Sequence, residues 1–338
     1  MNIMAHEENI TIQYCFPDNN SSCRKEVRTG PVYIFIFILL SCISVCTVVL
    51  NLLVIISISH FKQLHTPTNL LILSLAVADL LVGLFLMPVK ILELADSCWY
   101  LGKVGCYISP VINFLSISAS LFSLIVIAID RYIAVSDPLL YSTRLTVCKM
   151  SVIIIIGWSG SLFYAIVFLY FNGYFFRSQV KCFGECVLYV KQSWVIVDLV
   201  IVFVTPCSVI ILLYSIIFKI ARRQAKAVRA VSNGVSKSPS DKVLNTSETK
   251  AAKTLGIVIF VYLTCWIPYF ISSLTVENVT SVSIVWIVFA WLIYINSSMN
   301  PLIYAILYSW FRESVRCILS CRIFESSSSR INLFLERF

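Results

Sequence analysis

Charged residues are scarce in this sequence. Of its 338 residues only 13% are charged, and 59% are hydrophobic, whereas about a quarter of the residues in an ordinary soluble domain are charged. This scarcity excludes a soluble enzyme and a disordered chain, because both need a charged, water-facing surface. The apolar residues run in unbroken stretches and do not alternate with polar ones, which excludes an outer-membrane β-barrel. The composition therefore predicts a helical protein that crosses a membrane several times.

Other residue types are also scarce. Gly and Pro number ten each, too few for a Gly-rich fibre or a Pro-rich linker protein. The three histidines lie outside the apolar stretches, and no Cys/His grouping has the spacing of a metal site. With no metal set and no nucleophile paired with a base, we expect no enzyme activity. The net charge of +9 is typical of cations beside the cytoplasmic membrane face, and we expect no nucleic-acid partner.

Seven apolar stretches are long enough to cross a membrane, which takes about 20 helical residues for ~30 Å of hydrocarbon. They cover Val32–Ser59, Asn69–Leu94, Val104–Val135, Met150–Phe171, Ser193–Phe218, Thr254–Leu274 and Ser283–Leu307. The odd number places the two termini on opposite sides and argues against an inverted-repeat transporter. The predicted fold is an all-α membrane protein, a seven-transmembrane helix bundle over residues 32–307. An N-terminal tail (1–31) precedes it and a C-terminal segment (308–338) follows it.

The basic residues give this bundle an orientation. Nine Lys and Arg residues but only two acids lie between the fifth and sixth stretches, and five Arg residues follow the seventh. The positive-inside rule therefore puts the C-terminus in the cytoplasm and the N-terminus outside a plasma membrane. Three glycosylation motifs lie on the predicted outer tail, at Asn9, Asn19 and Asn20.

A short segment after the seventh stretch has its own pattern. Trp310–Leu319 alternates apolar residues with Arg and Glu at helical spacing, which predicts an amphipathic helix lying on the inner membrane face and contacting lipid. Cys317 and Cys321 beside it are candidate lipidation sites. The alternative is that they are buried free thiols.

Six charged residues fall within the apolar stretches. Lys90 and Glu93 lie near the outer end of the second stretch and can snorkel, whereas Asp79, Asp130, Arg131 and Asp198 lie deeper. A charge inside a membrane is costly, so each of these four indicates a functional site. The alternative for any of them is an interhelical hydrogen bond that only stabilises packing.

Read in order, the stretches carry one characteristic group each. These are Asn51, Asp79, Asp130-Arg131-Tyr132, Trp158, Pro206 with Tyr214, Cys265-Trp266-Ile267-Pro268 and Asn300-Pro301-Leu302-Ile303-Tyr304. The pattern resembles the rhodopsin-like G-protein-coupled receptors along nearly the whole chain. The run Asn296–Phe311, with His60–Asn69 and Lys250–Gly256, is similar to the trace amine-associated receptors. That resemblance implies a small-molecule amine ligand, such as a volatile amine, a diamine or a polyamine, and a role in olfaction. It also implies a heterotrimeric G protein of the stimulatory or olfactory type that raises cAMP.

The resemblance also implies roles for particular residues. The activation switch facing the G protein would comprise Asp130, Arg131, Tyr132, Tyr214, Glu248, Pro268 and Tyr304. A mid-membrane nest of Asp79, Ser120, Asn296 and Asn300 would hold an allosteric Na⁺; the alternative is a water-filled network without an ion. No other cofactor is expected.

One departure from the family pattern concerns the ligand. Amine receptors of this kind carry an Asp in the third stretch, 18 residues before Arg131, but this sequence has Asn113 there. Asp198 in the fifth stretch offers a replacement, a combination that resembles the fish-type subset of the family. The implied ligand site is Asp198, Asn113, Phe114, Trp266, Tyr269, Phe270, Trp291 and Tyr294.

Two other interpretations of the ligand site are possible from the sequence. Asp198 could instead be structural, complementing a helix N-terminus or reaching interfacial water, in a receptor for a non-amine ligand. A retinal protein is excluded, since the seventh stretch has Tyr294 and no Lys for a Schiff base.

Six cysteines fall in predicted extracellular positions, where disulfides are allowed. The family position implies the bridges Cys106–Cys186 and Cys23–Cys182. Cys15 and Cys98 are left either free or paired with each other.

Overall fold

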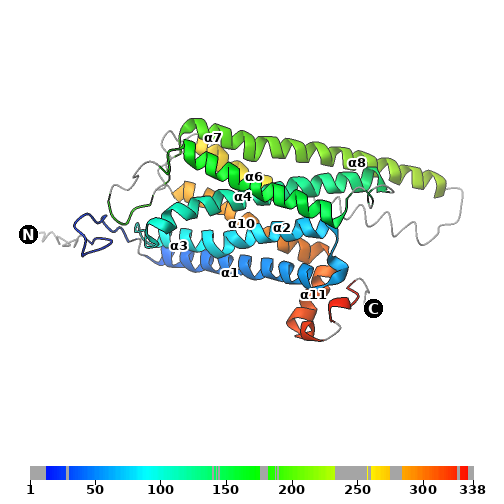
Figure 1. Ribbon diagram of the computed structural model, residues 1–338, viewed down its shortest axis with the longest axis horizontal. Coiled ribbons are helices and arrows are strands. Elements are labelled where there is room, and N and C mark those ends of the chain that lie inside the picture. Colours follow the sequence, from blue (N-terminus) through cyan, green and yellow to red (C-terminus); the bar gives the residue numbers. More distant parts are fainter. Residues whose placement is uncertain are drawn as a thin grey trace, which may run out of the picture.

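The computed structural model describes residues 13–27, 30–138, 141, 143, 145–175, 182–186, 188, 190–232, 257, 260–274, 284–325 and 328–333. Within these residues the chain is helical, apart from isolated β-bridges near the N-terminus. The long helices lie side by side as one bundle, and the N- and C-termini lie at its opposite ends (Figure 1). We call these the disulfide end and the Arg131 end, after the features that each one carries.

Seven helical segments build the bundle in the described part of the chain. They are α1 (Pro31–His60); α2 (Pro67–Leu81) continued by η2 (Val82–Leu86) and α3 (Met87–Ala95); α4 (Gly102–Ser136); α6 (Val147–Phe171); α7 (Gln192–Asp198) continued by η3 (Leu199–Val204) and α8 (Thr205–Ser232); Phe260–Leu274; and α10 (Ile284–Leu307). The first five are 25 to 35 residues long and apolar enough to span a membrane, counting the fifth to Ile220. Phe260–Leu274 is a shorter apolar helix.

Local sequence signals set several helix starts. Pro occupies the first turn of α1 and of α2, where its missing N–H costs nothing. The Thr66 hydroxyl accepts a hydrogen bond from the Asn69 N–H, and Thr146 does the same for Lys149 at the start of α6. These starts lie within three residues of the predicted ones. The fifth segment, however, ends well beyond the expected Phe218, because α8 continues as a polar helix that projects past the bundle (Figure 1).

Two of the spans contain a π-helical stretch. η2 interrupts the second span just before Pro88, and η3 lies between Asp198 and Pro206 in the fifth. A π-helical stretch holds more residues per turn than an α-helix, so it rotates the side chains on one side of it relative to those on the other. Both stretches therefore change which residues at the disulfide end of their span face the bundle interior.

The helix α4 lies at the centre of the bundle and contacts α2, α6 and α8. The interior contains a continuous apolar core, whereas the outer faces of the helices carry exposed large apolar side chains, including Phe35, Ile155, Phe163 and Leu212. An exposed apolar surface of this extent fits a lipid environment and would be unstable in water.

The amphipathic helix predicted after the bundle is present as α11 (Ser309–Leu319), which crosses the Arg131 end at a steep angle to the other helices (Figure 1). Trp310 and Phe311 are buried against the bundle, while Arg312 and Arg316 are exposed. Cys317 is buried, and burial raises the pKa of its thiol. Cys321 is exposed just after the helix, so it is the accessible member of the pair.

Candidate functional site

Asp198 is the last residue of α7, immediately before the π-helical stretch. Its carboxylate is partly buried, and Oδ1 accepts a 2.6 Å hydrogen bond from the hydroxyl of Tyr164 on α6. Tyr164 was not among the predicted site residues. A neutral hydroxyl orients a carboxylate without supplying a counter-charge, so Tyr164 leaves Asp198 without an ionic partner in this hydrogen bond.

Aromatic rings cover the α4–α6 side of Asp198. The ring centroids of Phe114 and Phe168 lie 4.4 Å apart, Phe168 is 6.0 Å from Tyr164, and Phe168 meets the Trp194 ring edge-on at 5.7 Å. Phe114 is thus joined to Tyr164, the hydrogen-bond partner of Asp198, through the ring of Phe168. Phe168 and Trp194 were missed by the sequence analysis, because an aromatic residue in an apolar run gives no signal that separates pocket from packing.

A second set of aromatic side chains lies along the helix Phe260–Leu274. Trp266 stacks between Tyr262 and Phe270, with ring centroids 5.2 and 5.9 Å away. Phe270 in turn meets Phe203 of η3 at 5.1 Å, one turn of chain beyond Asp198. The Tyr269 ring lies edge-on to Phe270 at 5.3 Å. Trp266, Tyr269 and Phe270 therefore form one group, joined to the fifth span through η3.

The remaining predicted residues lie on another wall. Trp291 and Tyr294 of α10 meet edge-on at 5.7 Å and pack against Met87, Ile91 and Leu94 of α3. The Tyr294 hydroxyl donates a 3.4 Å hydrogen bond to Oδ1 of Asn113 on α4. The eight predicted ligand residues thus fall into two groups of contacts, which we call the acidic wall, around Asp198, and the amide wall, around Asn113 and Tyr294.

A polar nest occupies the middle of the bundle. Asp79 is fully buried; Oδ2 accepts a 2.8 Å hydrogen bond from the Asn300 amide, and Oδ1 accepts a 3.2 Å bond from Ser120. Ser297, which was not predicted, is a further hydrogen-bonding partner of the carboxylate. Asn296 is buried one residue before Ser297. Three of these donors come from α4 and α10, so the nest ties the second, third and seventh spans together.

Asp130 and Arg131 lie at the other end of α4. The Arg131 guanidinium pairs with Oδ2 of Asp130 at 2.6 Å, and the hydroxyls of Thr68 and Tyr141 donate to the same carboxylate at 2.7 and 2.8 Å. Arg131 also donates to the Thr68 hydroxyl. The acid is therefore held by both an ion pair and two neutral donors.

An open groove lies beside this pair. Its volume is about 470 Å³, and its lining consists of Thr66, Pro67, Thr68, Arg131, Tyr141, Leu145, Thr146 and Val147. The Arg131 side chain reaches this groove while still paired with Asp130. Such a pair can restrain the closed arrangement of the bundle and be released when another group binds Arg131.

Comparison with known proteins shows to which family this helix bundle belongs. The profile of the 7 transmembrane receptor (rhodopsin family) matches residues 50–304. The chain is 40% identical to Trace amine-associated receptor 13c of Danio rerio, over 98% of this chain and 99% of that protein. It is also 39% identical to Trace amine-associated receptor 6 of Homo sapiens, over 97% of each chain. The chain belongs to the trace amine-associated receptors of the rhodopsin family. The fold class and the family predicted from the sequence are thereby confirmed, and the family consists of receptors, not enzymes.

The other residues predicted for the activation switch lie at several places in the bundle. Tyr304 is buried with its ring 5.8 Å from that of Tyr308. The Tyr214 hydroxyl is buried without a hydrogen-bond partner among the described residues. Tyr132 and Pro268 are partly buried. Glu248 lies outside the described residues, as does the glycosylation candidate Asn9, whereas Asn19 and Asn20 are exposed.

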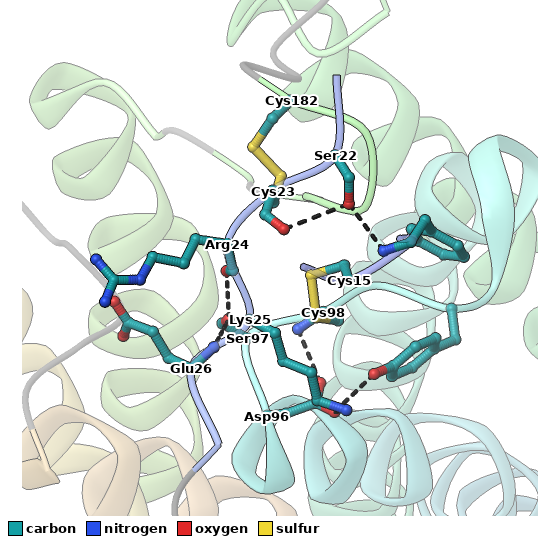
Figure 2. The surroundings of a disulfide bond; sticks show 12 residues. Cys15, Ser22, Cys23, Arg24, Lys25, Glu26, Asp96, Ser97, Cys98 and Cys182 are labelled. Carbon is teal, nitrogen blue, oxygen red and sulfur yellow. Dashed lines mark hydrogen bonds and ion pairs between the residues drawn. A yellow bond between two sulfur atoms is a disulfide. The ribbon is translucent and has the colours of Figure 1, made fainter. Parts of the chain in front are cut away.

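The receptor's N-terminal segment, residues 13–27, covers the disulfide end (Figure 2). The two bridges expected from the family, Cys106–Cys186 and Cys23–Cys182, are both present. Cys15 and Cys98 form a third bridge, so the alternative in which they pair is the one found. The segment is consequently bonded both to the turn between α3 and α4 and to the loop before α7.

Hydrogen bonds reinforce this attachment. The Glu26 N–H donates to Ser97 Oγ at 2.9 Å, and Ser97 Oγ donates to the Arg24 carbonyl (Figure 2). Lys25 pairs with Asp96 at 3.3 Å, and hydrogen bonds to Tyr100 and Asp96 raise the pKa of the Lys25 ammonium. Residues 13–27 therefore form a fixed cover rather than a free tail.

The third bridge should matter for this cover. We expect the double substitution Cys15→Ser and Cys98→Ser to leave the other two bridges intact and to destabilise the cover by about 2–4 kcal/mol, a typical effect of losing a disulfide. Hydrogen exchange in residues 13–27 should rise while exchange within α4 stays unchanged. Cys46→Ser, at an exposed free thiol, is the matched control. Non-reducing peptide mapping that recovered Cys15 and Cys98 as free thiols would contradict the prediction.

Proposed function

We propose that this receptor senses amines, with the ligand ammonium paired to Asp198 and the signal passed to a heterotrimeric G protein. The observation that carries the proposal is the position of Asp198: a charged acid within a span, oriented by Tyr164 and flanked by aromatic rings. Aromatic faces and one carboxylate are the groups that bind an organic cation. The relatives are named trace amine-associated receptors, and this name gives the same ligand class.

The amine is bound from the acidic wall because Asn113 and Tyr294 offer no counter-charge for an ammonium. Asn113 and the Tyr294 hydroxyl hydrogen-bond to each other and can accept from or donate to a ligand, but they supply no charge. An ammonium left without a counter-charge in a low-dielectric pocket is strongly disfavoured. The ammonium therefore lies against Asp198, and the rest of the ligand extends toward Asn113.

A receptor for a non-amine ligand is the second candidate. The hydrogen bond from Tyr164 favours it, because that bond satisfies part of the hydrogen-bonding capacity of Asp198 without any ligand. Under this alternative the acid joins α6 to the fifth span and has only a packing role. It predicts that loss of the Asp198 charge does not weaken agonist binding.

The proposed topology follows from the two ends of the bundle. The disulfide end faces the extracellular side of the plasma membrane, where disulfides persist, and Asn19 and Asn20 are available there for glycosylation. The Arg131 end faces the cytoplasm and receives a G protein of the stimulatory or olfactory type, raising cAMP. Cys321, exposed beside α11, is the proposed lipidation site, and α11 rests on the inner lipid face.

The polar nest is proposed to take an allosteric Na⁺. The atoms available to bind a cation are carboxylate and hydroxyl oxygens, which are the ligands that hard cations require. Two further buried oxygens, Ser116 Oγ and Asn51 Oδ1, have no hydrogen-bond partner among the described residues. Ser116 lies one helical turn from Ser120 on α4, so its hydroxyl is available on the face that carries the Asp79 contact. These residues fit a cation that compensates the Asp79 charge.

A ligand screen tests the proposed function. We expect cells that display the receptor and carry a cAMP reporter to respond to at least one primary, secondary or tertiary amine, and not to the neutral alcohol of the same carbon skeleton. The matched alcohol is the control for hydrophobic binding. If neutral odorants activate the receptor and amines do not, the result would contradict the proposal and support the non-amine alternative.

A further inference from the structure

Lys90 and Glu93 form an ion pair in the outer part of the second span. Lys90 Nζ and Glu93 Oε2 are 2.7 Å apart, and the two side chains are 39% and 36% exposed. Both lie on α3, three residues apart, beyond the π-helical stretch η2. None of the functions described above uses them.

The position of Lys90 on α3 places it on the pocket side. Met87, Ile91 and Leu94 form the face of α3 that packs against Trp291 and Tyr294. Lys90 is three residues after Met87 and four before Leu94, so it shares this face. Tyr294 in turn donates to Asn113. Lys90 therefore belongs to the amide wall of the pocket, and its ammonium lies within electrostatic range of Tyr294.

The same pair acts electrostatically on Tyr174, which lies beside a disulfide bridge. The Tyr174 hydroxyl donates to the Cys106 carbonyl at 2.5 Å, beside the bridge to Cys186. Burial raises the pKa of Tyr174 to about 12, and the charges of Lys90 and Glu93 both act on it. Glu93 is three residues nearer than Lys90 to the disulfide end, about 4.5 Å along the helix. A ligand at the level of Tyr294 and Asn113 therefore meets Lys90 first.

We propose that Lys90 determines ligand specificity: it rejects α,ω-diamines and favours amines whose far end carries a carboxylate or another strong hydrogen-bond acceptor. This deepens the proposed function and rests on it. The pocket has an anion at the Asp198 wall and a cation at the opposite wall, which complements a dipolar ligand. A second ammonium is repelled by Lys90. A carboxylate is attracted, and an ammonium has three N–H donors, so Lys90 can bind it without releasing Glu93.

Three ligands of equal chain length test this: hexylamine, 1,6-diaminohexane and 6-aminohexanoate. Binding is measured as thermal stabilisation of the purified full-length receptor, with reporter dose–response curves beside it. Wild type should bind 6-aminohexanoate about tenfold more tightly than the diamine. Lys90→Met should abolish or reverse that preference. Lys90→Arg should restore the preference, because it restores the charge.

Glu93→Gln separates the two members of the ion pair. Removing the competing carboxylate should strengthen 6-aminohexanoate binding further and leave the diamine weak. The proposal would be overturned if wild type failed to bind 6-aminohexanoate, or if Lys90→Met kept the wild-type preference. It would also be overturned if wild type preferred the diamine and Glu93→Gln lost diamine binding.

Asp198→Asn, measured in parallel, distinguishes this proposal from the function on which it rests. If hexylamine binding is lost in Asp198→Asn while the preference is unchanged in Lys90→Met, only the role of Lys90 fails. If hexylamine binds equally to wild type and Asp198→Asn, the proposed amine site itself fails.

Discussion

Asp198→Asn should lower the potency of an amine agonist by about 10²–10³-fold or more, the equivalent of roughly 3–5 kcal/mol for breaking a buried ion pair. Asparagine keeps the shape of the side chain and can still accept the hydrogen bond from Tyr164. The substitution thus removes the counter-charge and little else. Dose–response curves on cells matched for surface expression measure the effect.

Two matched controls separate charge from hydrogen bonding at this site. Tyr164→Phe removes a neutral donor from the acid, and Asn113→Ala removes the neutral acceptor of Tyr294. Each should cost about 1 kcal/mol, or roughly fivefold in potency. An Asp198→Asn receptor that responds to an amine like wild type would reject the ammonium–carboxylate pair and support the non-amine alternative.

Asp79→Asn is expected to abolish the sodium dependence of agonist affinity and to weaken signalling. In wild type, replacing Na⁺ by N-methylglucamine should raise agonist affinity about fivefold or more, a common size for coupling between two sites. The cation would stabilise the arrangement in which Asn300 and Ser120 contact Asp79. Asparagine can keep such hydrogen bonds but carries no charge for a cation to compensate. Radioligand competition in the two buffers measures the difference.

Ser116→Ala is the companion variant for the nest. It removes one oxygen that has no partner among the described residues and leaves the Asp79 charge in place. The sodium effect should therefore be reduced but not lost. Equal sodium shifts in wild type and Asp79→Asn would show that the ion binds elsewhere.

The sequence was informative wherever a local chemical rule acts on it. The scarcity of charge and the length of the apolar runs determined a helical membrane bundle, because a membrane leaves no other arrangement for so apolar a chain. The Pro residues at the starts of α1 and α2 and the Thr caps at residues 66 and 146 determined helix starts, because they satisfy or remove free backbone donors locally. The alternation in Trp310–Leu319 determined which face of α11 is buried.

The tertiary structure decided which residues meet, because meeting depends on helix rotation and on contacts between distant segments. The π-helical stretches η2 and η3 set the rotation of Lys90 and Asp198, and no residue pattern marked them in advance. Tyr164 reaches Asp198 from 34 residues away, and Cys15 reaches Cys98 across 83. The sequence by itself determined that this receptor keeps an acid in its fifth span. Only the packing of α6 against the fifth span decided that this acid is oriented by a tyrosine.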